Sequence, residues 1–328
     1  MLYKVENYQV KFMDIKTLYV YSIDLPKICR IDYVTINKSR TLIAFTASDV
    51  EGKRKGIFLF NLNNGDLQTI YNKEAYDLLF DNSQERLFFN SGNAINYIDL
   101  QTGMVSKLYK FSRITYAPIS LCQNPEGTHI SYHKWKSDKK RLYIYNLLND
   151  IENDMGISFY RYSWLDNQRI IYSLNGGLSI LDIVTKKSER KIKNAKSLIK
   201  QYLDKDNQDN EIKVFKNIDL VVDDIGMPVV CDMNMYFEVF LTTNDKKHIG
   251  IYSIVEDKTD LQCHFSSNQG LIRNYGVLSD GETIYVEIEP NDLLNETIDA
   301  GIVYIKNNIM IDYNGWIPVN GSCVPSTF

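Results

Sequence analysis

The sequence predicts an all-β protein, a single β-propeller of four-stranded antiparallel sheets, and three observations support this prediction. Short stretches of alternating apolar and polar residues recur along the chain and end in turn-forming residues. The copies begin at residues 18, 57, 95, 142, 178, 250 and 301, so most steps are roughly 40 residues, the period of a propeller blade. The composition, 44% hydrophobic and 24% charged over 328 residues, excludes disordered and collagen-like proteins.

Two kinds of strand pair make up each repeat. The first is a hairpin in which an acidic or amide residue followed by a branched residue ends the leading strand. Its copies lie at 18–24, 57–65, 95–103, 142–147, 178–183, 250–255 and 301–308. The second is a strand, a polar turn and a strand, at 33–45, 77–89, 121–132, 162–172, 220–230 and 275–285. Alternation places every second residue in the packing between blades.

These copies favour seven blades over six. Strands at about residues 8–23 are expected to complete the blade begun by 301–313, because an open propeller would leave two unpaired edges. The alternative, a β-sandwich, would not repeat at this period. We therefore predict one domain, 1–328, with an inserted segment at 193–216. Apolar residues up to Tyr202 and Leu203 have helical spacing there, and this helix is either a functional lid or a patch over a blade junction.

The repeat resembles that of the TolB-like, WD-type propeller superfamily over most of the chain. The family pattern is W-S-P-D-G-x-x-I-A-F followed by I-Y-x-x-D, and its best copies are 121–146 and 33–63. Trp164 stands at the tryptophan position, the proline is kept only at Pro125, and Asp-Gly only at Asp280-Gly281. The resemblance implies the fold. It does not imply identity with TolB, which is periplasmic, because no signal-peptide run precedes the repeats.

Composition and charge also indicate compartment and partners. No apolar stretch approaches the length of a signal peptide or a membrane span. The formal charge of −4 gives no basic surface for nonspecific nucleic-acid binding. The five cysteines are unpaired in pattern and are expected to be reduced thiols. We therefore expect a cytoplasmic protein that binds neither nucleic acid nor membrane; its oligomeric state is not predicted.

Candidate binding residues cluster in the longer loops, which are predicted at 47–56, 134–141, 193–216 and 289–300 on one face of the propeller. A positive rim that would attract acidic peptides, phosphate or carboxylate is one interpretation, and a solvated polar loop is the other. The candidates are Lys53, Arg54, Lys55, His133, Trp135, Lys139, Lys140, Arg141 and Tyr202. His133 is either a ligand contact or a histidine partly buried at a blade edge.

Motifs for catalysis, metal binding or cofactor binding are not found. His129 and His133 share a strand face but are separated by roughly 13 Å, too far to bind one zinc ion. No P-loop, dinucleotide fingerprint, nucleophile elbow or HExxH motif occurs. Neither a cofactor nor a metal is therefore expected.

Two functional hypotheses follow from these features. The first is a propeller that acts as a recognition or scaffold module and binds a protein, a peptide or a small ligand, including an anionic one, on its loop face. The alternative is a propeller-type enzyme, namely a lyase, cyclase, epimerase or hydrolase. Propellers host both classes. Convergent ionisable residues would favour the enzyme, and an open face with exposed aromatic residues would favour recognition.

Overall fold

The computed structural model describes residues 1–14, 17, 19–25, 27–111, 119–136, 139–158, 162–174, 177–192, 221–225, 228–231, 234–243, 246–255, 261–267, 270–277, 284–290, 301–306, 309–312 and 317–318. These residues form strands and turns without a helix, in agreement with the all-β prediction. In the same residues no helix long and apolar enough to cross a membrane is found. The helix expected at 193–216 lies outside them.

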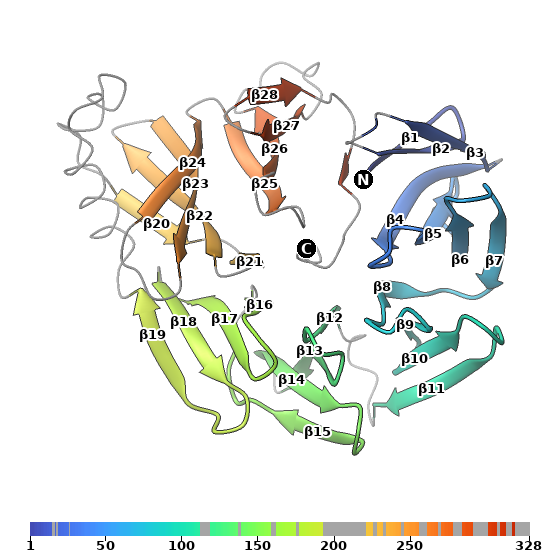
Figure 1. The fold of residues 1–328 in the computed structure, drawn as a ribbon, viewed down its shortest axis with the longest axis horizontal. Coiled ribbons are helices and arrows are strands. Elements are labelled where there is room, and N and C mark those ends of the chain that lie inside the picture. The colour runs from blue at the N-terminus through green and yellow to red at the C-terminus, as the bar shows by residue number, and fades with distance from the viewer. Residues whose placement is uncertain are drawn as a thin grey trace. The chain divides into compact units, whose positions relative to one another are not determined.

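The strands group into two compact units, and the first contains four sheets (Figure 1). It comprises residues 1–158 and the strand near the C-terminus. Three of its sheets each use four consecutive antiparallel strands. They are β4 (Ile28–Ile36), β5 (Leu42–Asp49), β6 (Arg54–Asn61) and β7 (Leu67–Tyr71); β8 (Tyr76–Phe80), β9 (Arg86–Ser91), β10 (Ala94–Asp99) and β11 (Val105–Lys110); and β12 (Ile119–Gln123), β13 (His129–Lys136), β14 (Lys139–Asn146) and β15 (Ile151–Asp154).

The fourth sheet of the first unit joins both ends of the chain, as the closure prediction required. Its order is β29 (Ile317–Pro318), β1 (Leu2–Glu6), β2 (Gln9–Met13) and β3 (Val20–Asp24). The segments differ from the prediction, because the strand that pairs with β1 is β29 rather than 301–313. The N-terminal strands also begin earlier, at Leu2. Two-residue pairing at β29 is too short to give a periodic signal in the sequence.

The second unit, residues 159–315, contains three further sheets. Two have four antiparallel strands, and the middle one has a fifth strand, β21, beside β22. They are β16 (Tyr162–Trp164), β17 (Arg169–Leu174), β18 (Gly177–Asp182) and β19 (Ser188–Ile192); β20 (Val221–Ile225), β21 (Val229–Cys231), β22 (Asn234–Thr243), β23 (Lys246–Val255) and β24 (Leu261–Ser267); and β25 (Gly270–Val277), β26 (Ile284–Pro290), β27 (Gly301–Lys306) and β28 (Ile309–Asp312). The number of blades stays a prediction.

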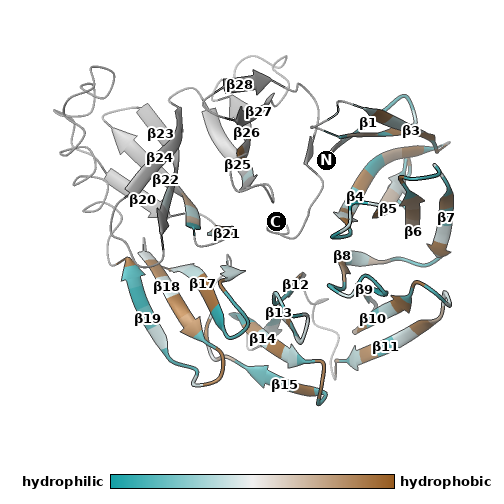
Figure 2. Cartoon of the chain, in the orientation of Figure 1, coloured by the Kyte–Doolittle hydropathy of each residue, from teal (hydrophilic) through white to brown (hydrophobic). Residues whose placement is uncertain are grey.

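Burial distinguishes the central strands of a sheet from its last strand. All but the last residue of β18 are buried, whereas all but the last residue of β19 are exposed. Figure 2 shows the same difference as an apolar β18 beside a hydrophilic β19. A strand between two packed sheets buries both faces, while the last strand meets solvent. The apolar runs in the sequence therefore mark the middle strands.

A side-chain oxygen at the end of the third strand closes the same turn in four sheets. In the β4–β7 sheet, Asn61 Oδ1 accepts a hydrogen bond of 2.9 Å from the Asn63 N–H. The equivalent acceptors are Asp99, Asn146 and Asp182, with bonds of 3.0, 2.8 and 3.0 Å. Asp and Asn readily form such Asx turns. Turn chemistry thus explains the acidic or amide residue that marks the repeat.

The residue after this acceptor connects two turns of the same sheet. The Leu100 N–H donates to the Glu85 carbonyl at 2.8 Å, and the Leu147 N–H donates to the Thr128 carbonyl at 2.9 Å. The turn after the first strand and the turn after the third strand are therefore held together. This backbone hydrogen bond fixes the position of the branched residue directly after the acidic or amide residue in the repeat.

Apolar side chains fill the spaces between neighbouring sheets of the first unit. The β29–β3 sheet and the β4–β7 sheet share a cluster that includes Val10, Phe12, Phe45 and Phe60. Phe12 stacks on Phe60 with ring centroids 6.1 Å apart. Two further clusters lie on either side of the β8–β11 sheet. These clusters fix the turns of the unit relative to one another.

Candidate functional site

The predicted basic loop at 134–141 is mostly strand, so the long-loop prediction is wrong there. Strands β13 and β14 stay paired as far as Lys136 and Lys139. Trp135 pairs with Lys140, and Lys134 pairs with Arg141. Side chains that pair across antiparallel strands share a face of the sheet. The candidate residues are therefore divided between two faces rather than gathered on one rim.

Strand alternation separates the three consecutive basic residues. Lys139 is exposed, Lys140 is only 6% exposed, and Arg141 is partly buried. Trp135 is 37% exposed, whereas His133 is completely buried. Of these residues, Trp135 and Lys139 offer surface to a ligand in this conformation. Extending the period of two into the loop would have given this result from the sequence.

The loop predicted at 47–56 is shorter than expected, because β5 continues to Asp49 and β6 begins at Arg54. Lys53 lies in the turn between them, with its ammonium 2.9 Å from a Glu51 carboxylate oxygen. The side chains of Arg54 and Lys55 lie outside the description, as do Tyr202 and the segments 193–216 and 291–300.

Carboxylates accompany the basic residues of these hairpins. Lys134 Nζ lies 2.5 Å from Glu152, and Arg141 lies 3.3 Å from Asp154. Together with the Lys53–Glu51 pair, these contacts reduce the positive potential that the sequence suggested. The Lys53–Glu51 pair is exposed and contributes little to stability, but all three pairs cancel charge.

The β13–β14 hairpin carries a buried ionisable group, Lys140. Burial lowers the pKa of Lys140, and the negative charge of Asp77 opposes that shift. Asp77 has a φ of 57°, and its carboxylate accepts the Leu121 N–H of β12 at 2.8 Å. The pairing of β8 with β9 shifts register at this point, and bulges of this type re-aim side chains. Burial also raises the pKa of the Cys122 thiol to about 12, which disfavours its thiolate form.

The structure adds a hollow that the sequence interpretation missed. It has a volume of about 420 Å³ and lies where the β1–β2, β3–β4 and β5–β6 turns meet. Its lining consists of Asn7, Tyr8, Asp24, Leu25, Lys27 and Val50. Its size is at the lower end of the range for small-ligand sites. The hollow combines an aromatic ring and two aliphatic side chains with an amide, a carboxylate and an ammonium group.

Three residues of this hollow have left-handed backbone conformations. Asn7, Tyr8 and Lys27 have φ values of 51°, 62° and 77°. Left-handed φ is unfavourable for a bulky residue such as tyrosine. The turn is nevertheless fixed, because Glu6 pairs with Gln9 across it and the Tyr8 carbonyl accepts the Leu25 N–H at 3.1 Å. Strain that the surroundings hold in place is frequent at binding sites.

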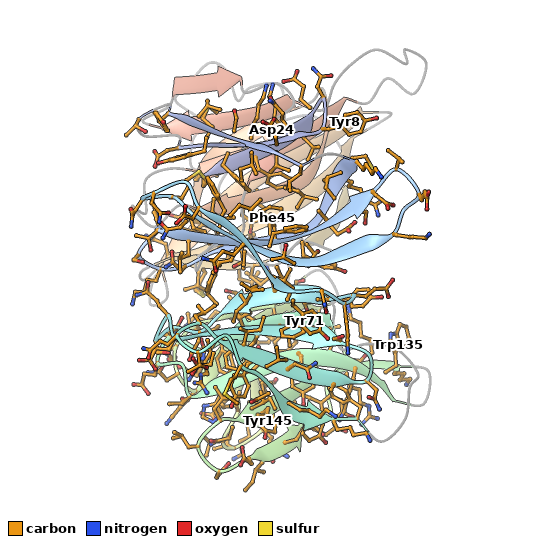
Figure 3. The ribbon with its side chains drawn as sticks, turned by 90° about the vertical axis from the view of Figure 1, so that its right-hand side faces the viewer. Tyr8, Asp24, Phe45, Tyr71, Trp135 and Tyr145 are labelled. Carbon is orange, nitrogen blue, oxygen red and sulfur yellow. The ribbon has the colours of Figure 1, made fainter. Side chains whose placement is uncertain are left out.

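Apolar side chains are unusually accessible around the hollow. Tyr8 is 54% exposed and Val50 is 63% exposed. Val50 begins a turn that Asp49 closes by accepting the N–H groups of Glu51 and Lys53 at 3.0 and 2.9 Å. Tyr8 and Trp135 point toward the same side of the first unit, on the right of Figure 3. We call this the loop side, defined by Tyr8, Val50 and Trp135.

The N-terminal hairpin carried a signal that could have identified this site. Tyr3 and Val5 alternate before Asn7-Tyr8, and Val10 and Phe12 alternate after it. Two residues between alternating runs, with Asn first, are typical of a tight hairpin. The prediction of strands at about residues 8–23 begins inside this turn and therefore misses it.

The residues that the structure describes contain no group of three or more His, Cys, Asp and Glu side chains placed to hold a metal ion. Cys29 and Cys122 are present as free thiols.

No protein-family model and no curated protein matches the sequence. Solved structures do match. The chain is similar to oligogalacturonate lyase from Vibrio parahaemolyticus, with 9% identity and a TM-score of 0.67, over 96% of this chain and 85% of the other. It is similar to the β-propeller domain of the Trilobed protease from Pyrococcus furiosus, with 14% identity and a TM-score of 0.58, over 94% and 91%.

A prolyl endopeptidase also matches, with 8% identity and a TM-score of 0.64, over 95% of this chain and 47% of the other. At these identities the likeness establishes the fold, and neighbours with this fold include an enzyme, which agrees with the functional breadth of propellers. The β-propeller fold that the repeat predicts is confirmed at this level.

Proposed function

We propose that this protein is a recognition module that binds a peptide or a peptide segment of a protein on its loop side, with Tyr8 as the main contact. The single observation that carries the proposal is the strained Asn7-Tyr8 turn, which presents an exposed aromatic ring at the edge of a hollow. The cytoplasmic location expected from the sequence stays a prediction.

The lining of the hollow matches a peptide better than an inorganic anion. Leu25 and Val50 offer apolar surface, while Asp24 and Lys27 offer one charge of each sign. A peptide presents apolar side chains together with amide donors and acceptors. Aromatic residues with aliphatic neighbours dominate the binding energy of such contacts. The paired state of Lys53, Lys134 and Arg141 removes most of the support for a strongly anionic ligand.

Backbone strain supports a functional role for Tyr8 rather than a structural one. Glycine after asparagine is the preferred residue of a two-residue hairpin turn, and tyrosine in the left-handed region costs about 1–2 kcal/mol. The ring is more than half exposed, so core packing does not compensate for this cost. Residues that reduce stability while presenting a side chain to solvent are typical of binding sites.

The test uses this difference between stability and binding. Peptides are selected from a random displayed library on the immobilised full-length protein, and their Kd values are measured by fluorescence anisotropy. Tyr8→Gly should weaken binding by about tenfold or more. The same substitution should raise the free energy of unfolding by about 1 kcal/mol, because glycine relieves the left-handed strain.

Met104→Ala is the matched control, since Met104 is 66% exposed on the β10–β11 turn, away from the hollow. It should change Kd by less than about twofold. Peptides that bind Tyr8→Gly as tightly as wild type, or that are lost only with Met104→Ala, would contradict recognition at the loop side.

An enzyme of the lyase, cyclase, epimerase or hydrolase type is the second candidate. The observation that favours it is Lys140, a buried lysine with a lowered pKa near Asp77, because such groups occur at catalytic sites. One solved neighbour is named for oligogalacturonate, so that compound is the first substrate to test. Turnover that is lost in Lys140→Met but kept in Lys139→Met would support this candidate, and absence of turnover would remove that substrate.

A further inference from the structure

Lys134 is enclosed by aromatic rings at the junction of the β8–β11 and β12–β15 sheets. Its ammonium nitrogen lies 3.8 Å from the Tyr143 ring centroid, 5.6 Å from that of Phe111 and 5.7 Å from that of Tyr109. A cation within about 6 Å of a ring centroid is attracted by the ring quadrupole. We call Tyr109, Phe111, Tyr143 and Glu152 the ammonium cage.

Glu152 provides the negative charge of this cage. Its Oε2 lies 2.5 Å from the Lys134 ammonium and also accepts the Tyr109 hydroxyl at 3.1 Å. Its other oxygen accepts the Tyr132 hydroxyl. A carboxylate that is held by two tyrosines keeps a fixed position with little reorganisation. Three ring faces and one carboxylate are the arrangement by which proteins recognise alkylammonium groups.

The side chains of the cage come from two sheets and are held by contacts that do not involve Lys134. Tyr109 comes from β11, Tyr143 from β14 and Glu152 from β15, and β11 lies beside β14 and β15 in Figure 1. Tyr109 also contacts Tyr145 edge-on at 5.4 Å, and Tyr143 stacks on Tyr132 at 6.2 Å. These contacts hold the rings whether or not an ammonium lies between them.

The cage is also accessible from solvent. The side chains of Lys134 and Glu152 are 21% and 15% exposed. Lys134 is the third residue from the end of β13, next to the hairpin that carries the exposed Trp135. A rotamer change of the lysine alone would therefore empty the cage without unpairing a strand. Rotamer changes of partly exposed side chains occur within nanoseconds.

We propose that the ammonium cage is a binding site for an external alkylammonium group and that Lys134 fills it as a tethered ligand. The proposal is separate from peptide recognition at the hollow. Because the tethered ammonium competes at a high effective concentration, wild type shows only weak affinity for an external ligand. Removing the competitor exposes the site.

The experiment measures tetramethylammonium and ethylammonium binding to wild type and to Lys134→Ala by calorimetry, with sodium chloride at equal ionic strength as the salt control. Lys134→Ala should bind at least about tenfold more tightly than wild type. Lys139→Ala, which removes an exposed lysine outside the cage, should behave as wild type. Adding Tyr143→Leu to Lys134→Ala should abolish the gain.

The two ligands separate the possible sources. Stronger binding of tetramethylammonium indicates a quaternary group such as choline or a trimethylated lysine, and stronger binding of ethylammonium indicates an unmodified lysine or a primary amine. Either result supports the ammonium cage.

Three results would overturn the proposal. They are a folded Lys134→Ala that binds neither ligand, equal binding by wild type and Lys134→Ala, and binding that persists after Tyr143→Leu. If Lys134→Ala is partly unfolded, added ammonium must increase its folded fraction by circular dichroism beyond the effect of sodium chloride. Failure of that rescue also counts against the site.

Discussion

The two junctions on either side of the β8–β11 sheet have the same packing role but different chemistry. Toward β4–β7 the sheet buries Leu87, Phe89 and Ile98 against Ala44 and Ile57, a cluster whose buried members are aliphatic and phenylalanine side chains. Toward β12–β15 the same sheet buries apolar side chains against three tyrosines, Tyr132, Tyr143 and Tyr145. One sheet therefore has an apolar junction on one face and a tyrosine junction on the other.

The difference shows what tyrosine adds to a repeated packing position. Each ring fills the junction as phenylalanine would, but each hydroxyl requires a partner once it is buried. The strand β15 and the turn before it supply carboxylates: Glu152 for Tyr132, Asp154 for Tyr143 and Asp150 for Tyr145. The tyrosine junction thereby fixes acidic groups, and through them Lys134 and Arg141.

The largest effect is expected in the apolar junction. Phe89 is completely buried, and Phe89→Ala leaves a cavity between two sheets, so the free energy of unfolding should fall by about 3–5 kcal/mol. Urea denaturation measures this loss. Tyr97→Ala is the control on the tyrosine junction of the same sheet, because Tyr97 is only partly buried there and should cost less. Equal losses would show that burial does not govern the stability of the two junctions.

Alkaline pH should destabilise the protein through the tyrosine junction. Burial, followed by the nearby Asp154, raises the pKa of Tyr143 to about 12. Burial, followed by the Asp150 hydrogen bond, does the same for Tyr145. Their stabilising contribution is complete below pH 10, the ordinary tyrosine pKa, and is lost as the pH rises toward 12.

Each tyrosine should therefore lower the free energy of unfolding by about 1.4 kcal/mol per pH unit in that window. Urea denaturation at successive pH values gives the slope, which should be smaller in Tyr143→Phe and Tyr145→Phe. A slope unchanged in both variants would mean that these hydroxyls titrate alike in the folded and unfolded chain.

The smallest changes in stability are expected when one tyrosine hydroxyl is removed from each junction. Tyr132→Phe removes a hydrogen bond to a charged Glu152 and should cost about 1–2 kcal/mol. Tyr71 lies against the apolar junction and its hydroxyl bonds the neutral Ser91 at 3.1 Å, so Tyr71→Phe should cost less than about 1 kcal/mol. Thermal melting of both variants tests the order, and the reverse order would contradict the stated role of Glu152.

Much of the fold was predictable because its signals are local. The spacing of residues such as Asn61, Asp99 and Asp182 follows from turns that each sheet closes on its own. The alternating strands between them repeat for the same reason. The pairing of β1 with β29 was only half predicted, because the contact joins residues at opposite ends of the chain and involves two residues of β29.

The candidate site was less predictable than the fold. The sequence predicts one basic loop that includes Lys139, Lys140 and Arg141, but continued strand pairing separates these residues. The alternating pattern around Asn7-Tyr8 predicts the turn, but the position of Tyr8 beside Leu25 and Val50 around one hollow is not visible in the sequence around it. Sites formed by turns from several strands depend on how those strands pack.

The sequence by itself determined the strands, their turns and the repeat, because alternation and Asx chemistry act over a few residues. Only the tertiary structure decided which charges are cancelled, which tyrosines are buried and where a hollow opens. Those properties depend on packing: Lys134 and Glu152 pair across strands of one sheet, and Tyr8 and Val50 line one hollow from turns of two neighbouring sheets. Partners far apart in the sequence come together there through packing, which no local pattern encodes.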